Sequence, residues 1–119
     1  MKCKLLTLKD GYFLHLEQSE LNIMREREKS NVGFCFAVLD GHGAAFYVFI
    51  DIDAESVHVR HIGGAFAWKW GYIENLCHMV AREAGLNKIT VCADKDFMFH
   101  ALKKLGFKHV QDDLYGKEI

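Results

Sequence analysis

Histidine and cysteine are the residue types in this chain that could bind a metal or take part in proton transfer. The seven histidines form no HxxxH or HExxH motif, and only His58 and His61 lie close together. On a strand, a spacing of three places these two side chains on opposite faces. Because a structural zinc site needs four convergent ligands, the sequence predicts no metal site.

The four cysteines lie in apolar sequence at positions 3, 35, 77 and 92, and they form no CxxC pair. Disulfide frameworks are typical of oxidising compartments and small secreted domains. The sequence therefore predicts free, buried thiols in a reducing compartment.

The elements that position these residues follow from the spacing of the apolar side chains. Residues 4–8, 32–39, 44–52 and 56–62 are rich in aromatic and β-branched residues and are predicted strands, with a hairpin turn around 40–43. Two short helices are predicted before residue 30. Ser19 is expected to cap the second, and Glu20 favours the positive end of that helix.

The second half of the chain changes to helical spacing. Apolar residues between 73 and 84 recur every three or four positions, and Gly85 follows them as a left-handed cap would. A strand at 88–93, a helix at 98–105 ended by Gly106, and a hairpin of 107–111 and 114–117 are predicted next. The order β-αα-βββ-α-β-α-ββ predicts an α+β (α/β) fold: a mixed central sheet of about six to seven strands with helices on both faces. Since prolines and low-complexity segments are absent, residues 1–119 are predicted to form a single domain.

This order, together with two short motifs, resembles the GCN5-related N-acetyltransferases (GNAT). The segment AREAGLNKITV at 81–91 is similar to the family's a-x-x-x-G-x-x-x-i-x-l strand entry, and LKKLGF at 102–107 is similar to its Y-e-k-l-G-F helix end. The resemblance covers nearly the whole chain and implies a GNAT-like, acyl-coenzyme A-binding domain. The implied activity is transfer of acetyl from the co-substrate acetyl-CoA to a primary amine by direct attack.

In this family the strand before the long helix diverges from its neighbour, and its backbone pairs with the pantetheine arm. The resemblance places Ile62, Gly63 and Gly64 beside that arm and the acyl thioester. Paired glycines after a strand also mark a bulge or an ordinary flexible turn.

The family's loop Q/R-x-x-G-x-G/A turns backbone N–H groups toward the pyrophosphate at the helix N-terminus. The corresponding cofactor-binding residues here are Trp68, Lys69, Trp70, Gly71 and Tyr72. Gly71 matches the first glycine, whereas Ile73 stands at the second and Trp68 at the Gln/Arg position. Three alternatives stay open: a pyrophosphate site made by Lys69 and backbone N–H groups, indoles packed into the groove, or aromatic anchors for a protein partner.

The resemblance also implies a base that deprotonates the acceptor ammonium. The selected catalytic candidates are His61, His58 and Asp94, and the alternatives are Asp51, Asp53 and Asp96. The ordinary interpretation is that the histidines face solvent and that the aspartates form turns. The family's tyrosine acid is replaced by Leu102.

A second function is compatible with the same residues: a catalytically inactive GNAT-fold binding or structural protein with a degenerate coenzyme A loop. Residues 100–107 are similar to a helix of compact acetyltransferase-like proteins of tailed phages. The net charge of -1 and the lack of a basic stripe predict no nucleic-acid partner. No apolar window reaches a membrane span. We expect a cytoplasmic monomer or homodimer whose partners are acyl-CoA and an unidentified amine acceptor, either a small molecule or a protein.

Overall fold

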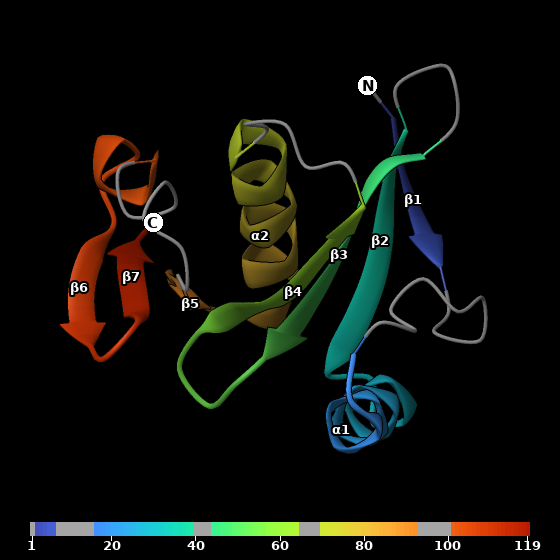
Figure 1. The fold of residues 1–119 in the computed structure, drawn as a ribbon. Helices are drawn as coiled ribbons and strands as arrows, with labels where there is room; N and C mark the ends of the chain where they lie inside the picture. The colour runs from blue at the N-terminus through green and yellow to red at the C-terminus, as the bar shows by residue number, and fades with distance from the viewer. Residues whose placement is uncertain (1, 7–15, 40–43, 65–69, 93–100) are drawn as a thin grey trace. The chain divides into compact units, whose positions relative to one another are not determined.

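The structure is a computed structural model, and it describes residues 2–6, 16–39, 44–64, 70–92 and 101–119. These residues belong to two compact units (Figure 1). One unit comprises Met1–Asp51 with His61–Ala67, and the other comprises Ile52–Arg60 with Trp68–Ile119. The prediction of a single domain over 1–119 stays a prediction.

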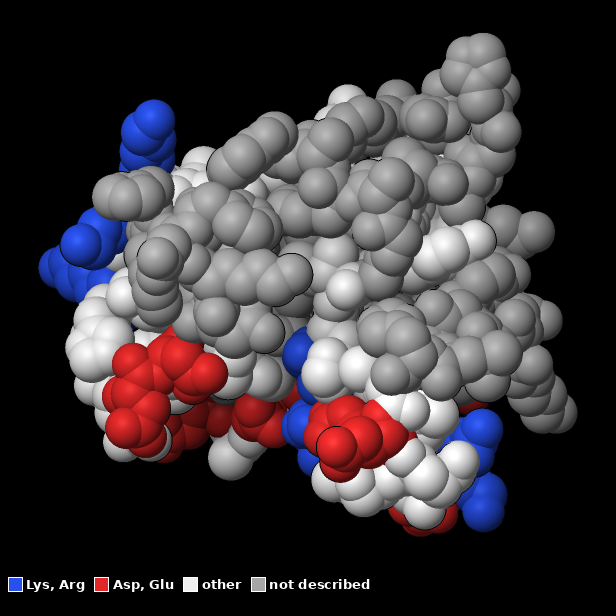
Figure 2. Space-filling view, in the orientation of Figure 1, with Lys and Arg blue, Asp and Glu red and all other residues white. Residues whose placement is uncertain are grey.

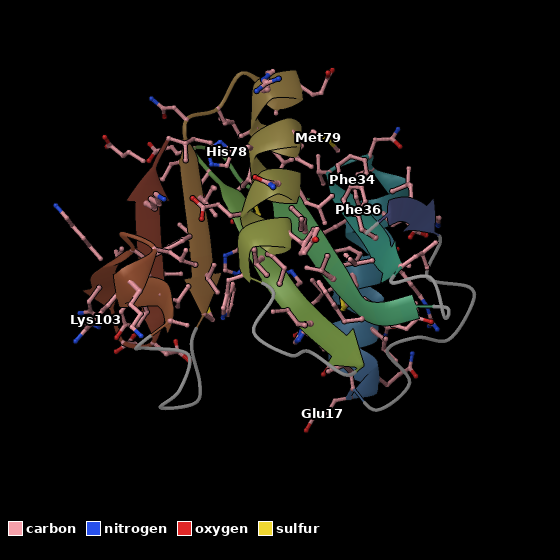
Figure 3. All side chains as sticks on the ribbon, turned by 90° about the horizontal axis from the view of Figure 1, so that it is seen from above. Glu17, Phe34, Phe36, His78, Met79 and Lys103 are labelled. Atoms are coloured by element: carbon pink, nitrogen blue, oxygen red, sulfur yellow. The ribbon has the colours of Figure 1, made fainter. Side chains whose placement is uncertain are left out.

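The first unit contains three antiparallel strands in the order β1-β2-β3: β1 (Lys2–Leu6), β2 (Gly33–Leu39) and β3 (Ala44–Ile52). Aromatic and β-branched residues fill β2 and β3, as their strand propensity requires. Helix α1 (Gln18–Lys29) packs against β2 through a core cluster of Leu21, Met24, Cys35 and Phe49. Phe34 and Phe36 are labelled together on β2 in Figure 3, consistent with the two-residue period of a strand.

The start of α1 differs from the prediction that Ser19 caps it. The N-cap residue is Glu17, whose backbone is extended at φ -62° and ψ 149° and whose carbonyl oxygen accepts a hydrogen bond from the Leu21 N–H at 3.1 Å. Ser19 is therefore inside the helix. The amide of Gln18 donates to Asn22 Oδ1 at 2.9 Å, an i,i+4 contact that supports this earlier start. The first of the two predicted helices falls at residues outside the described ranges.

A buried ion pair and a close approach fix α1 on the strands of the first unit. The Asp51 side chain has no exposed surface, and its Oδ2 lies 2.9 Å from Arg27 Nε. Gly33 lies beside both elements: a Cβ there would stand 2.6 Å from Phe49 Cζ and 2.9 Å from Arg27 Cβ. Glycine is required at this position because any side chain would displace the helix or the phenyl ring.

The second unit contains strands in the order β4-β5-β7-β6, with β4 and β5 parallel and the remaining pairs antiparallel. The strands are β4 (Val57–Gly64), which contributes residues to both units, β5 (Lys88–Cys92), β6 (Lys108–Gln111) and β7 (Leu114–Glu118). Helix α2 (Trp70–Ala84) connects β4 to β5, as a parallel pair requires. The described strands and helices confirm the predicted mixed α+β arrangement.

Both predicted glycine caps in the second unit are confirmed. Gly85 has φ 71° and Gly106 has φ 91°, in the left-handed region that only glycine enters without strain. Backbone hydrogen bonds close each helix end: Leu86 N–H donates to Ala81 O at 2.8 Å, and Phe107 N–H donates to Leu102 O at 3.0 Å. Residues 101–104 are the described part of the second predicted helix.

Three sequence predictions need correction. Gly63 and Gly64 lie inside β4 and do not follow it, because the apolar alternation ends at Ile62 while the extended backbone continues. The first strand begins at Lys2, two residues before its predicted start at Lys4. Cys92 is exposed at the end of β5, whereas Cys35 and Cys77 are buried as predicted. No helix in the described ranges is long and apolar enough to cross a membrane.

Candidate functional site

The exposed start of α2 is the part of the second unit best suited to bind an anion. The first N–H groups of a helix have no intrahelical acceptor, and the helix dipole makes this end positive. The first turn of α2 carries no acidic residue to neutralise that charge. Gly71 and Tyr72 are exposed here, and a Cβ on Gly71 would meet no atom within 4 Å. An anion can therefore approach the backbone closely.

Trp70 begins α2 and is a core residue, because only 5% of it is exposed. Its surroundings include Val59, Ile89, Val91 and Phe107, which line an apolar cavity of about 10 Å³ with it. That cavity has hardly the room for one water molecule. Of the three alternatives for the aromatic loop, an indole packed into the protein is the one that applies to Trp70. Tyr72 differs, because 42% of it is exposed. Trp68 and Lys69 lie outside the described residues.

Among the described residues, three positions of β4 pair with β5. The register joins Val57–Val59 to Ile89–Val91, and β4 continues to Gly64. Ile62, Gly63 and Gly64 are thus on the part of β4 beyond that register, in the first unit.

His58 belongs to a polar cluster in the second unit. Its Nδ1 lies 2.8 Å from the hydroxyl oxygen of Thr90, which is in turn 3.4 Å from the hydroxyl oxygen of Ser56. Thr90 and Ser56 are both buried. This contact fixes the imidazole ring against β5, so His58 has a defined structural role.

His61 is paired with a carboxylate in the first unit. Its Nε2 lies 3.1 Å from Oε1 of Glu20, which comes from the first turn of α1. The exposed fractions of the two side chains are 29% and 30%, so the pair is held in place and still open to solvent. A carboxylate that contacts one ring nitrogen orients the imidazole ring. Sequence reasoning missed this role of Glu20, because pairing across 41 positions leaves no local signal.

The aspartates proposed from the sequence differ in what holds them. Asp51 is fully buried against Arg27 and stabilises the fold. Asp53 is exposed, and its backbone N–H donates to Ser56 O at 2.8 Å, which forms the turn before β4. Asp94 and Asp96 lie outside the described residues.

Two further side chains of the second unit bear on the chemistry. Leu102, at the position of the family's tyrosine acid, is fully buried. Burial, helped by the nearby Glu74 carboxylate, raises the pKa of the Cys77 thiol from 9.0 to about 12. Cys77 is therefore protonated and unsuited to act as a nucleophile. Among the residues that the structure describes, no group of three His, Cys, Asp or Glu could hold a metal ion.

Comparison by sequence finds no match, either to a protein-family model or to a curated protein. Comparison with solved structures finds several matches. A GNAT family acetyltransferase from Elizabethkingia anophelis with acetyl-CoA bound matches with a TM-score of 0.72 at 10% identity, covering 99% of this chain and 97% of the other. The PaiA N-acetyltransferase of Thermoplasma acidophilum in complex with coenzyme A matches with a TM-score of 0.64 at 12% identity, covering 100% of both chains.

A chain from the AtaT–AtaR complex bound to DNA is also similar, with a TM-score of 0.66 at 13% identity, covering 99% of this chain and 94% of the other. At such low identities the similarity shows the fold alone. The chain therefore has the fold of the GCN5-related N-acetyltransferases.

Proposed function

We propose that this chain is an N-acyltransferase that transfers acetyl from acetyl-CoA to a primary amine by direct attack. The exposed start of α2 is the observation that carries the proposal. It combines open space over Gly71 with a first turn free of acidic residues. Such a helix end binds phosphate through its backbone N–H groups.

In this proposal the pyrophosphate of coenzyme A contacts the backbone N–H groups of Trp70, Gly71 and Tyr72. Lys69 adds a positive charge and Trp68 flanks it. The burial of the Trp70 indole is compatible with this role, because only its backbone would face the ligand. Ile62, Gly63 and Gly64, at the end of β4, would offer backbone groups to the pantetheine arm.

We assign the proton transfer to His61, with Glu20 as its orienting partner. His61 takes a proton from the acceptor ammonium, and the neutral amine then attacks the thioester carbon. The C–N bond forms, the C–S bond breaks, and the thiolate of coenzyme A leaves with the bonding electrons. Since Leu102 cannot donate a proton, the thiolate is protonated from solvent. His58 and Asp94 stay as further candidates for the base, and the acceptor is a small molecule or a protein.

The alternative is a GNAT-fold binding or structural protein without catalysis, of the phage-like kind. The buried Ile73, at the position of the second loop glycine, and the buried Leu102 favour it, because both replace residues that the enzymes use. For either function we propose a cytoplasmic location.

Titration calorimetry with acetyl-CoA tests the proposal. Saturable heat and a rise in unfolding temperature are expected, because a ligand that binds only the folded state stabilises it. No heat at millimolar acetyl-CoA would overturn the proposal. Binding without release of free thiol across a panel of primary amines would instead favour the alternative.

A pair of histidine variants tests the base once turnover is seen. His61→Gln should lower kcat/KM by about 10²- to 10⁴-fold with acetyl-CoA affinity unchanged. His78→Gln is the control, since His78, labelled in Figure 3, is a partly exposed histidine of α2 that also contacts a carboxylate, with its Nε2 3.6 Å from Glu74 Oε1. An equal loss in both variants, or none in His61→Gln, would remove His61 from the mechanism.

A further inference from the structure

The face of β5, β7 and β6 that points away from α2 carries an unusual row of residues. The register pairs His58 with Thr90, Thr90 with Gly116, and Gly116 with Lys108, so the four positions form one line across β4, β5, β7 and β6. Directly paired residues share a face of a sheet. Ile89 and Val91 face the apolar cavity under α2, and Thr90 between them therefore faces the other way.

An open groove of about 490 Å³ lies over the β5–β7–β6 end of this face. Its lining includes Lys88, Lys108, Val110, Gly116 and Glu118. Gly116 belongs to this lining, and a Cβ there would lie 3.3 Å from Val110 Cγ2 and 3.4 Å from Lys88 Cε. The glycine therefore lets the Val110 and Lys88 side chains lie close to β7.

The lysines of the groove differ in how their charges are compensated. Lys117 contacts the Glu74 carboxylate at 2.5 Å. In the described part of the chain, Lys88 and Lys108 have no ion-pair or hydrogen-bond partner. Strands two apart in a sheet, with an offset of two residues, put the two Cα atoms about 12 Å apart. Two flexible lysine side chains can span that distance and contact one anion above Gly116.

We propose that this groove binds a small molecule through a phosphate or pyrophosphate group, with Lys88 and Lys108 as its cationic contacts. Lysine carries a compact charge on a flexible side chain, which suits phosphate oxygens. A nucleic acid is less suited to the site, because the acidic Glu118 lines it. On the face drawn in Figure 2, described Lys and Arg side chains lie beside Asp and Glu side chains. The site is on the sheet face opposite α2 and is independent of acyl transfer.

Heteronuclear NMR with inorganic pyrophosphate tests the proposal, at constant ionic strength and in saturating acetyl-CoA. Saturable shifts are expected at the amides of Gly116 and Lys108. The variants Lys88→Gln and Lys108→Gln should each weaken binding at least tenfold. Gly116→Ala is the fold-preserving variant, because the residue lacks a positive φ and the added methyl needs only small movements, and it should weaken binding as well.

The matched control is Lys103→Gln, an exposed lysine of the same unit that is labelled in Figure 3. It removes the same charge outside the groove and should leave the affinity within twofold. Shifts that do not saturate, or an equal loss in the control, would overturn the site as nonspecific attraction. Shifts that are seen without acetyl-CoA but are absent in saturating acetyl-CoA would mean that the α2 site was being observed. Tighter binding of duplex DNA, sensitive to Lys103 as well, would replace the small-molecule proposal with a nucleic-acid surface.

Discussion

The substitution Gly71→Glu separates folding from cofactor binding at the start of α2. The new side chain has room, because a Cβ on Gly71 meets nothing within 4 Å. Glutamate has a higher helix propensity than glycine by about 0.5 kcal/mol. A negative charge near a helix N-terminus adds about 0.3–1 kcal/mol. The variant is therefore expected to be more stable by about 1 kcal/mol, a rise in Tm of about 4 °C.

The same carboxylate should oppose binding of a pyrophosphate. Two unit charges about 5 Å apart at an effective dielectric constant of about 20 repel each other by about 3 kcal/mol. That energy corresponds to a loss of about two orders of magnitude in affinity. A general defect of folding would lower stability and affinity together, whereas this change is expected to raise the first and lower the second.

Differential scanning calorimetry and titration with acetyl-CoA measure the two effects separately. Asn75→Glu is the control, since Asn75 is also exposed on α2 and lies one helical turn, about 5.4 Å, further from the helix start. It should lower acetyl-CoA affinity much less than Gly71→Glu does, because its charge is about twice as far from the pyrophosphate and salt screens it further. If Gly71→Glu binds acetyl-CoA as tightly as the native chain, the start of α2 does not hold the pyrophosphate and the reasoning is wrong.

Two further predictions concern the units separately. Gly33→Ala should destabilise the protein by about 1–3 kcal/mol in urea unfolding, because the added methyl group would overlap Phe49 and Arg27. The control Gly71→Ala should be neutral or stabilising, since nothing lies within 4 Å of its Cβ position. Equal effects of the two substitutions would contradict the packing around Gly33. Burial raises the pKa of the Cys77 thiol from 9.0 to about 12, so the folded state keeps this proton at a pH where the unfolded state loses it. The free energy of unfolding should therefore be unaffected below pH 9 and should fall by about 1.4 kcal/mol per pH unit as the pH rises toward 12. The unfolding free energies of the native chain and Cys77→Ala should therefore converge above pH 9, and a constant difference would be contrary to that burial.

Local chemistry made much of the fold predictable from the sequence. The helical period of residues 73–84 and the cap at Gly85 need only neighbours along the chain, and both are confirmed. The turn at Asp112–Asp113 is likewise local, and Asp112 has φ 47°. The start of α1 was less predictable because Ser19 is a strong cap in isolation. The observed start depends on the extended backbone of Glu17, which a propensity does not encode.

The candidate site was harder to predict, because its contacts join distant positions. The pairing of His61 with Glu20 and of His58 with Thr90 depends on which elements lie together, and neither partner carries a motif. The two histidines look equivalent in sequence. In the structure His61 contacts a partly exposed carboxylate and His58 contacts a buried hydroxyl group, so the two rings have different surroundings.

The aromatic residues of the loop and the loss of its second glycine are a weaker argument against cofactor binding than the sequence suggests. A helix start binds phosphate with backbone N–H groups, and a side chain interferes only if it points into the same space. Trp70 is buried, and the position that follows it is a glycine with open space above. The exposed residue that could obstruct a ligand is Tyr72, whose ring can rotate about its side-chain bonds. The loss of the glycine motif therefore removes freedom of the backbone but leaves the donors in place, and affinity for acetyl-CoA is the quantity that decides the function.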